Sequence, residues 1–550
     1  MIFRSRVTSG HHPSAAGSTM DSNFIPPLDM QQTLFSELSS MFGNEVPLYD
    51  KSLAVNFQCN RAVADLLESV FAGFSLTDEQ IISTSRERHG AIRIGREDEF
   101  RWITRYFACF GMEPHNFYDM TNLGMKSQPV IATAFRSKID PKNRVFTSLL
   151  CPDYFDEDTA REIRSLLGTR QVLSDEARAL IERHEEDGGL RFQDAHALIA
   201  EGTQRIFKWT GEARNRRLYT SLCDRGFKIA ADIACFSSHH LNHLTPNTLC
   251  IDLYSDAMKW RLGLIDRASF LQRVEHWFDY ITSTVDTDWL LLHFTHLHHV
   301  DVAAFEKREV SRTGLRELIA RFTNSLEVEA LDLASLNHNG YKHETEGPAV
   351  GTQILLRQDA YRALTEQIRF VDESPHFETE HTARFGEIEQ RFYATTPKGR
   401  ALYDSCIRSD SGDSSESGQS RFESFPSRLR DLVERELVYA VFEPGERLDE
   451  GEAALDSRNV MDLVRDGVLL CRGMRYEDFL PLSAAGIFAS NLEQYGTDST
   501  ADERPTYERT HLESIMNRPI VDSDAVYSSL QRESLHASLR SLGVKRSMDE

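Results

Sequence analysis

The chain has 550 residues and a formal net charge of −23 at pH 7, from 62 Lys and Arg against 85 Asp and Glu. So acidic a surface repels nucleic-acid phosphates and anionic lipid headgroups, which excludes both as expected partners. No apolar run of about 18 residues occurs, so no membrane span is predicted. The length suffices for two or three domain-sized units.

Residues 1–28 are predicted to be a disordered tail. Arg4 and Arg6 lie in this segment and no acid precedes Asp21, so a mitochondrial transit peptide is the alternative, although the amphipathic periodicity is poor. The eight cysteines of the whole chain are scattered without C-x-x-C pairs, which is typical of neither a disulfide framework nor a zinc finger. This usage indicates a reducing, intracellular setting, and a cytoplasmic location is expected.

Residues 29–150 are predicted to form N-terminal helices and a first βαβββ unit. A short β run, HGAIRIG, begins at His89 and precedes an amphipathic helix. The helix has apolar residues at helical spacing: Phe100, Ile103, Phe107 and Phe110. Three further β runs follow, HNFYDM, PVIATAFR and RVFTSLL.

The same order of elements recurs over residues 228–405. A β run, HLTPNTLCI, begins at His243, a helical stretch follows from Asp252, and β runs lie around TQILLRQD, QIRFVD and ARFGEIEQR. We therefore predict an α+β fold in which two βαβββ units form a central cupped sheet around one cavity, with large helical insertions.

The remaining segments are predicted to surround or close that cavity. Residues 151–227 and 255–335 are helical in pattern and are interpreted as insertions that act as lids or flanking helices. Residues 406–424 are rich in Ser, Asp and Gly and are predicted to be a disordered loop. Residues 425–495 are expected to close the active site, and the polar residues 496–550 are expected to be a loosely held tail.

Side chains in the two units indicate a metal site. Alternate residues of a strand share a face, so His89, Ala91 and Arg93 point the same way, about 13 Å from first to last. His243 lies at the corresponding place in the second unit, which favours it over the neighbouring His239 and His240 as a ligand.

The carboxylate is not decided by strand geometry. Glu387 and Glu389 share one face of the last strand, and one is expected to bind metal while the other pairs with an arginine. Two imidazoles and one carboxylate leave a divalent metal with open positions, as in non-heme Fe(II) centres that bind a 2-oxo acid and then O2. A zinc hydrolase could use similar ligands.

Six separated stretches, in one order between about residues 30 and 495, resemble the DUF1338 family. They are RHGAIRIG; FGMEPHNFYDM with TAFR; ADIACF with HLNHLTP; ILLRQDAYRALTEQ; HTARFGEIEQR with TPKGRALYD; and YEDFLPLSAAGIFASNL. Characterised members of that family are iron(II)-dependent 2-oxoadipate dioxygenase/decarboxylases of the vicinal oxygen chelate superfamily. The resemblance therefore implies two vicinal-oxygen-chelate-like units.

The resemblance also implies roles for particular residues. The family's metal ligands fall on His89, His243 and Glu387, and the similar Glu-Ile-x-Gln-Arg run of 4-hydroxyphenylpyruvate dioxygenases supports Glu387. The family's substrate arginine, the catalytic residue expected here, falls on Arg93. Its substrate-contacting loop falls on Leu482 and Ser483, which with Arg93, His89 and His243 make up the expected substrate-binding set.

The implied reaction uses Fe(II) and O2 and a small 2-oxo acid as partner. The carboxylate and keto oxygens of 2-oxoadipate chelate the iron, Arg93 binds the distal carboxylate, and oxidative decarboxylation and hydroxylation give 2-hydroxyglutarate and CO2. The substrate carries its own 2-oxo group, so no separate 2-oxoglutarate is needed. The sequence predicts no particular oligomeric state.

Three positions depart from the family pattern, and a long insertion precedes residue 345. Asn247 stands where the family has an arginine, Cys250 where it has an acid, and Leu482 where it has a valine. A positive charge lost near the cavity is expected to change how the distal end of the substrate is held.

Two other groups of residues have structural interpretations. The histidines of LLHFTHLHHVD, namely His293, His296, His298 and His299, are predicted to lie on a partly exposed helical face rather than to form a second metal site. Asp232 is predicted to have a turn or buried pairing role. The alternative functions are a vicinal-oxygen-chelate lyase or isomerase with a non-redox metal, and a non-catalytic interaction protein with a degenerate pocket.

Overall fold

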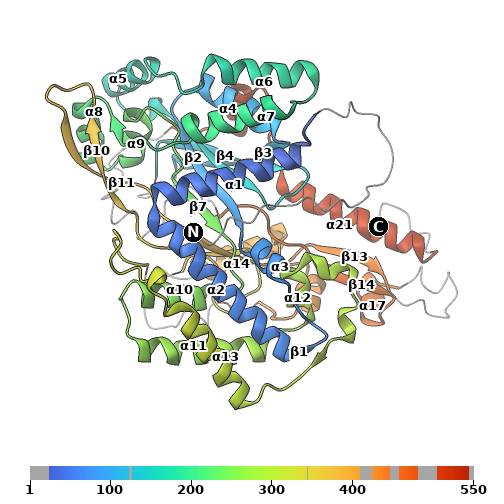
Figure 1. The fold of residues 1–550 in the computed structure, drawn as a ribbon. Helices are drawn as coiled ribbons and strands as arrows, with labels where there is room; N and C mark the ends of the chain where they lie inside the picture. The colour runs from blue at the N-terminus through green and yellow to red at the C-terminus, as the bar shows by residue number, and fades with distance from the viewer. Residues whose placement is uncertain are drawn as a thin grey trace.

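The computed structural model describes residues 24–122, 127–342, 345–408, 422, 425–445, 458–480 and 505–543. Helices surround several β-sheets in a mixed arrangement (Figure 1), which confirms the predicted α+β class. None of the helices within these ranges combines the length and the apolar character that crossing a bilayer requires.

The central sheet has five strands in the order β3-β4-β5-β2-β7. They are β2 (Glu87–Ile94), β3 (Met112–Asp119), β4 (Val130–Ser137), β5 (Arg144–Leu150) and β7 (His243–Pro246). Strand β2 pairs in parallel with β5 and antiparallel with β7. Its side chains alternate between two environments, because Ile92 and Ile94 enter the main hydrophobic core whereas His89 and Arg93 lie on the opposite face.

The strands of the second half divide into a strand pair and a hairpin. They are β9 (Leu356–Ala360), β10 (Thr365–Phe370), β11 (Phe377–Thr382) and β12 (Glu387–Arg391). Strand β12 pairs antiparallel with β9, while β10 and β11 form a sheet with β6 (Glu212–Ala213). Four strands thus form where three β runs are predicted, because the β10–β11 hairpin turns away from β12.

Strand β12 lies alongside β7. A parallel bridge joins Asn247 and Glu389, and the backbone N–H of Thr248 donates to the carbonyl of Glu389 at 2.8 Å. This contact brings the last strand of the second half to the edge of the central sheet, next to β7.

Helices fill both predicted insertions and the N-terminal region. The N-terminal helices are α1 (Pro27–Glu45), α2 (Pro47–Val70) and α3 (Asp78–Ser85), and α4 (Glu97–Cys109) follows β2. Residues 151–227 contain α5 (Glu157–Gly168), α6 (Asp175–Asp187), α7 (Phe192–Glu201) and α8 (Arg216–Asp224), after which comes α9 (Lys228–Cys235). The second set is α10 (Ile251–Arg261), α11 (Arg267–Thr284), α12 (Thr287–His293) and α13 (Arg312–Leu326), and a short pair joins β1 (Phe71–Ala72) to β8 (Glu306–Lys307).

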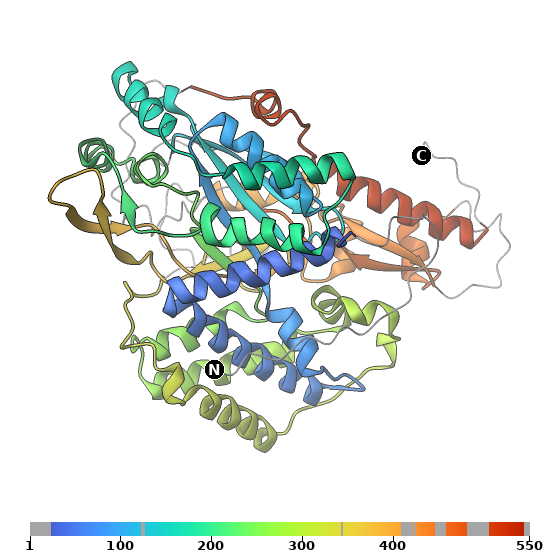
Figure 2. The ribbon, with the colours of Figure 1, turned by 45° about the horizontal axis from the view of Figure 1, so that its top comes forward.

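The prediction of a loosely held C-terminal tail is wrong for residues 505–543. They form α20 (Arg509–Met516) and α21 (Ser523–Ser541), preceded by α14 (Pro397–Arg408), α15 (Leu429–Glu434), β13 (Ala440–Pro444), α17 (Val460–Arg465) and β14 (Leu469–Gly473). Leu512, Ile515 and Met516 are buried at helical spacing, a short apolar stripe hidden in a polar composition. Figure 2 shows α21, in red, alongside the antiparallel strand pair β13–β14.

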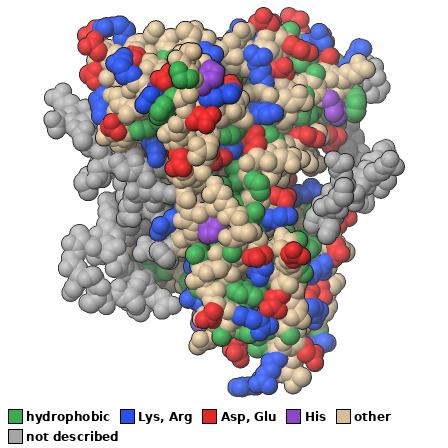
Figure 3. All heavy atoms as spheres, turned by 60° about the vertical axis from the view of Figure 1, so that its left-hand side comes forward, with side chains coloured by type: hydrophobic (Ala, Val, Ile, Leu, Met, Phe, Trp, Pro, Cys, Tyr) green, Lys and Arg blue, Asp and Glu red, His purple; other side chains and the backbone are tan. Residues whose placement is uncertain are grey.

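Two other predicted segments, the N-terminal tail and the loop at 406–424, can be compared with the structure only in part. Helix α1 begins at Pro27, just inside the predicted tail of residues 1–28. Most of the predicted loop at 406–424 lies outside the described residues. On the face seen in Figure 3, Lys and Arg side chains are interspersed with Asp and Glu, so the negative net charge is not one continuous field there.

Candidate metal centre

The pairing of β2 with β7 sets the two candidate histidines side by side. His243 is the cross-strand partner of Ala91, and Thr245 is the partner of His89. Cross-strand and diagonal neighbours on one face of an antiparallel pair are within reach of each other. The imidazole centroids of His89 and His243 are accordingly 5.6 Å apart, with their planes perpendicular.

Strand β12 brings Glu387 to the same place. Its Oε2 lies 3.0 Å from His89 Nε2 and 3.3 Å from His243 Nε2, and it accepts a hydrogen bond from Thr245 Oγ1 at 2.7 Å. One ligand atom from each of His89, His243 and Glu387 lies within 4.8 Å of the other two. Within the described ranges this is the only cluster of three or more His, Cys, Asp or Glu side chains so arranged.

The chemistry of these atoms fits a bound metal ion. All three side chains are buried, yet Glu387 Oε1 and both ring nitrogens of His243 have no hydrogen-bond partner among the described residues. Buried polar atoms are normally satisfied, and a divalent ion would satisfy Glu387 and the one ring nitrogen of His243 that carries a lone pair. Two imidazoles and one carboxylate leave coordination positions open for other ligands.

The protonation states also suit metal binding. Burial lowers the pKa of His243 to about 4, so its imidazole is neutral near pH 7 and free to ligate. Burial by itself raises the pKa of Glu387, but the nearby His243 and His89 outweigh it and hold that pKa below its usual value. The carboxyl group is therefore ionised, as a metal ligand must be.

Glu389 lies on the other side of the His89 ring. Its Oε2 lies at ion-pair distance from His89 Nδ1, 2.9 Å, without hydrogen-bond alignment, whereas its carboxylate accepts hydrogen bonds from Arg144 and Arg391. Burial opposes ionisation here too, but Arg391, His89 and Arg144 hold the pKa of Glu389 well below its usual value. Of the two glutamates considered as ligands, Glu387 faces both histidines and Glu389 pairs with arginines.

Aromatic rings form the walls of the centre. Phe385, two residues before Glu387, stacks on His243 with centroids 4.8 Å apart, and Phe479 meets the His89 ring edge to face at 4.7 Å. Such rings exclude water and limit the movement of the imidazoles. Phe479 comes from the stretch YEDFLP, near the end of the described residues 458–480.

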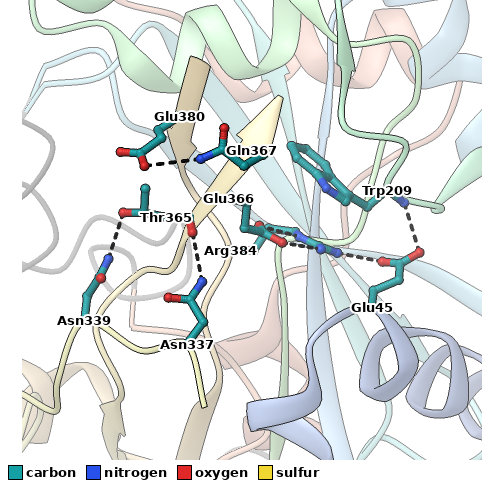
Figure 4. Close-up of a pocket in the computed structure, with 9 residues that line it drawn as sticks. All are labelled: Glu45, Trp209, Asn337, Asn339, Thr365, Glu366, Gln367, Glu380 and Arg384. Atoms are coloured by element: carbon teal, nitrogen blue, oxygen red, sulfur yellow. Dashed lines mark hydrogen bonds and ion pairs between the residues drawn. The ribbon is translucent and has the colours of Figure 1, made fainter. Parts of the chain in front are cut away.

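Arg384 anchors the chain just before Phe385. Its guanidinium donates to Glu45 and Glu366, and Figure 4 shows it between these two carboxylates. They lie at the edge of an open cavity of about 760 Å³, whose lining also includes Trp209 and Glu380. Three carboxylates line this cavity and its arginine is already paired, so it does not suit a dicarboxylate substrate.

Arg93 points to a second buried polar cluster. Its Nη1 donates to Asp232 Oδ2 at 2.6 Å. Asp232 Oδ1 lies 3.0 Å from His381 Nε2 and 3.1 Å from His240 Nε2, and Tyr219 Oη lies 2.8 Å from His381 Nδ1. The predicted buried pairing role of Asp232 is confirmed, and the pairing partner is the predicted substrate arginine.

The structure describes Asn247 but not the predicted substrate loop. Leu482 and Ser483 lie outside the described residues. Asn247 is buried, and its Oδ1 accepts a hydrogen bond from Arg475 Nη2 at 2.7 Å. A guanidinium thus reaches the place where the family's own arginine is missing, and it comes from a part of the chain that sequence reasoning did not consider.

The histidine-rich segment does not form a single exposed face. His293 is buried at the end of α12, stacks on Trp289 with centroids 3.9 Å apart, and its Nδ1 lies 2.9 Å from the Trp289 carbonyl. His296 and His298 are half-buried and His299 is exposed, in a 3₁₀ turn rather than a helix. The prediction of a shared helical face is wrong, because the chain changes direction after His293.

Burial of His293 predicts a pH-dependent stability. Burial lowers the pKa of His293 to about 3, whereas the unfolded chain titrates near 6.5. Below pH 6.5 the unfolded state binds a proton that the folded state does not, so stability falls as pH decreases, by at most about 1.4 kcal/mol per pH unit for one group.

We expect urea unfolding of the metal-free protein between pH 6.5 and 5 to show a shallower loss of stability for His293→Leu than for the unchanged protein. The comparison isolates His293, since other groups, such as Asp288 with its pKa raised by burial to about 6, titrate in both. Equal slopes would contradict the expectation.

Several residues of the centre were missed by sequence reasoning. Arg144, Phe385 and Phe479 contact the ligands or their partner Glu389, yet each occurs in a short β or loop run with no periodicity of its own. An arginine at the start of the β run RVFTSLL, whose other residues carry no charge, is the one signal that could have indicated Arg144.

The fold and site define a mixed α+β protein with a buried centre of two histidines and one carboxylate. The family model for 2-oxoadipate dioxygenase/decarboxylase matches residues 34–266 and 265–491. The chain therefore belongs to the 2-oxoadipate dioxygenase/decarboxylase family.

Individual relatives agree with this membership. A 2-oxoadipate dioxygenase/decarboxylase of Pseudomonas putida is 30% identical over 547 residues, 95% of this chain and 98% of that protein. Another, of Escherichia coli, is 28% identical over 93% of this chain and 98% of that protein. The crystal structure of the hydroxyglutarate synthase from Pseudomonas putida in complex with 2-oxoadipate is similar, with a TM-score of 0.65 and 27% identity, covering 95% of this chain and 100% of that one.

Proposed function

We propose that the protein is an Fe(II)-dependent dioxygenase/decarboxylase that converts 2-oxoadipate, or a similar 2-oxo dicarboxylic acid, and O2 to 2-hydroxyglutarate and CO2. The observation that carries the proposal is the convergence of His89, His243 and Glu387 at one buried point, with Arg93 on the same face of β2 as His89. Relatives named for this activity support it.

Each residue has a definite part in the proposed reaction. His89, His243 and Glu387 would hold the iron, which when bound supplies the redox chemistry and the positions for the 2-oxo acid and O2. Arg93 would bind the distal carboxylate, and its guanidinium is held in place through the hydrogen bond from Nη1 to Asp232. Phe385 and Phe479 would keep water from the reacting carbons.

The balance of the reaction requires no further reactant. Both atoms of O2 enter the products. One carboxyl group leaves as CO2, one oxygen atom converts the former keto carbon into the new carboxylate of a five-carbon diacid, and the other hydroxylates the carbon next to it. Leu482 and Ser483 are proposed, on the family motif, to contact the substrate.

We also propose a finer organisation of the chain. Strand β7, α10 and strands β9 to β12 would form the second βαβββ-like unit, which completes a cupped sheet with the first, and the two helical insertions would flank it. A cytoplasmic location is proposed because the eight cysteines, all among the described residues, form no disulfide with one another, as is usual in reducing compartments.

An oxygen-uptake measurement tests the proposed function. The Fe(II)-loaded protein is expected to consume one O2 and release one CO2 for each 2-oxoadipate, with 2-hydroxyglutarate as product, and to act more slowly on 2-oxo dicarboxylates of other lengths. The matched control is the same protein loaded with Zn(II), which should consume no O2. Turnover of a substrate without O2 uptake would contradict the proposal and favour a lyase or isomerase.

A further inference from the structure

We propose that Glu389 is a positioning residue for the metal ligand His89, held in place by Arg144 and Arg391. This inference rests on the metal centre of the proposed function, but it concerns the affinity for the ion and not the reaction.

The first step is the contact between Glu389 and the ring of His89. Glu389 Oε2 lies 2.9 Å from His89 Nδ1, while His89 Nε2 is directed at Glu387 Oε2, 3.0 Å away. A neutral imidazole carries one proton. The Glu389 carboxylate lies at ion-pair distance from Nδ1, without hydrogen-bond alignment in this structure, and its negative charge favours the tautomer with the proton on Nδ1. The lone pair of Nε2 then faces the point where Glu387 and His243 meet, which is the orientation that a metal ligand needs.

The second step is that Glu389 itself is held rigidly. Arg144 Nη2 donates to its Oε1 at 3.1 Å, and Arg391 donates to both carboxylate oxygens, with Nη2 2.8 Å from Oε2. The side chains of Glu389, Arg144, Arg391 and His89 are all fully buried. Both carboxylate oxygens of Glu389 are thus engaged by arginines and histidine, whereas Glu387 Oε1 has no partner within the described part of the chain.

The third step is that Arg391 also orders the wall beside His89. Its Nη1 donates to the carbonyls of Tyr476 and Asp478 at 2.9 Å each. These bonds fix the backbone just before Phe479, whose ring packs on His89. His89 is therefore constrained through its Nδ1 and through its ring face by one connected network.

Glu477 provides a matched control for Glu389. It is also a buried glutamate paired with Arg144, and the surrounding arginines hold the pKa of its carboxyl below the usual value against the effect of burial. No contact between Glu477 and His89 occurs in the described structure within hydrogen-bond distance. Neutralising Glu477 perturbs the arginine network without removing the partner of Nδ1.

The test is the affinity of the metal-free full-length protein for Co(II), measured by competition with a chromophoric chelator. We expect Glu389→Gln to weaken Co(II) binding by about 10- to 100-fold, the range observed for partners of metal-bound histidines, and Glu477→Gln to change it by less than about 3-fold. The visible absorption bands of the Co(II)-saturated Glu389→Gln protein should shift, because the His89 ring is no longer fixed.

Two results would overturn the proposal: Co(II) affinity of Glu389→Gln within about 3-fold of the unchanged protein, or equal losses in both variants. Should Glu389→Gln not fold, as judged by circular dichroism, Glu389→Asp replaces it. This variant keeps the charge but withdraws the carboxylate from Nδ1, and an unchanged affinity would again overturn the proposal. If the unchanged protein binds Co(II) but the iron form does not oxidise 2-oxoadipate, only the proposed function fails.

Discussion

Replacing Arg93 with alanine is expected to abolish turnover of 2-oxoadipate while the iron content per chain stays nearly unchanged. Truncating one partner of a buried, hydrogen-bonded charge pair costs about 2–5 kcal/mol or more, which corresponds to a loss in kcat/KM of roughly 30- to 5,000-fold or greater. The metal ligands are not touched, because the one side-chain hydrogen bond that Arg93 makes to a described residue is to Asp232.

A second substitution, at Asp232, is needed to distinguish a loss of substrate binding in Arg93→Ala from a loss of stability. Without Arg93, Asp232 is left buried beside His240 and His381, and an unpaired buried charge can destabilise the fold by about 3–5 kcal/mol. Arg93→Ala combined with Asp232→Asn removes that charge, and it should remain folded and still lack activity. Asp256→Asn, which weakens the pair between buried Asp256 and half-exposed Arg273, is the control expected to stay active.

A substrate analogue without the distal carboxylate distinguishes the loss of carboxylate binding from a general loss of catalytic activity. A 2-oxo acid with a methyl group in place of the distal carboxylate should be a poor substrate for the unchanged protein and should lose no more with Arg93→Ala. Unimpaired turnover of 2-oxoadipate by the variant would refute the assignment of Arg93.

The strand positions of the candidate histidines could be predicted, because the alternation of side chains along a strand depends only on neighbouring residues. A period of two along β2 places His89 and Arg93 on one face whatever the tertiary structure, and the repeat of element order places His243 at the matching point. The pairing of His243 with Ala91 then follows from the antiparallel register of β2 and β7. The faces of the strands on which His89, Arg93 and His243 lie could therefore be predicted from the sequence.

The choice between Glu387 and Glu389 could not be made in that way. Both lie on one face of β12, and the difference between them arises from β5, which supplies Arg144, and from the register of β12 against β7. Likewise, the contact of Arg475 with Asn247 joins residues 228 positions apart. Long-range placements of this kind have no signal in the period or composition of a segment.

The position of helix α21 also could not be predicted from the composition of its segment. The polar composition after residue 496 predicts a loosely held tail, yet Tyr527 on α21 is buried. Its hydroxyl donates to Asp478 Oδ2 at 2.5 Å and accepts from the backbone N–H of Glu477 at 2.8 Å. This helix therefore supports the segment that carries Phe479 to His89, a role that depends on two hydrogen bonds rather than on apolar content.

Glu387→Ala is expected to lower the affinity for Fe(II) or Co(II) by more than about 100-fold, which exceeds the loss expected for a residue that only orients a ligand. The substitution removes the one carboxylate that faces both histidines, and two imidazoles alone hold a divalent ion weakly. His89 and His243 remain in place, because their rings also pack on Phe479 and Phe385. Metal analysis after dialysis and a Co(II) titration measure the loss.

The comparison of the two glutamates decides which of them binds the ion. If Glu387 is the ligand, Glu387→Ala should leave no tightly bound metal, whereas Glu389→Gln should retain a weakened site with one ion per chain at saturation. The reverse order of effects would assign the ligand to Glu389. The structure argues against that outcome, since ligation by Glu389 would require its carboxylate to leave two buried arginines, whose charges would then lack that partner.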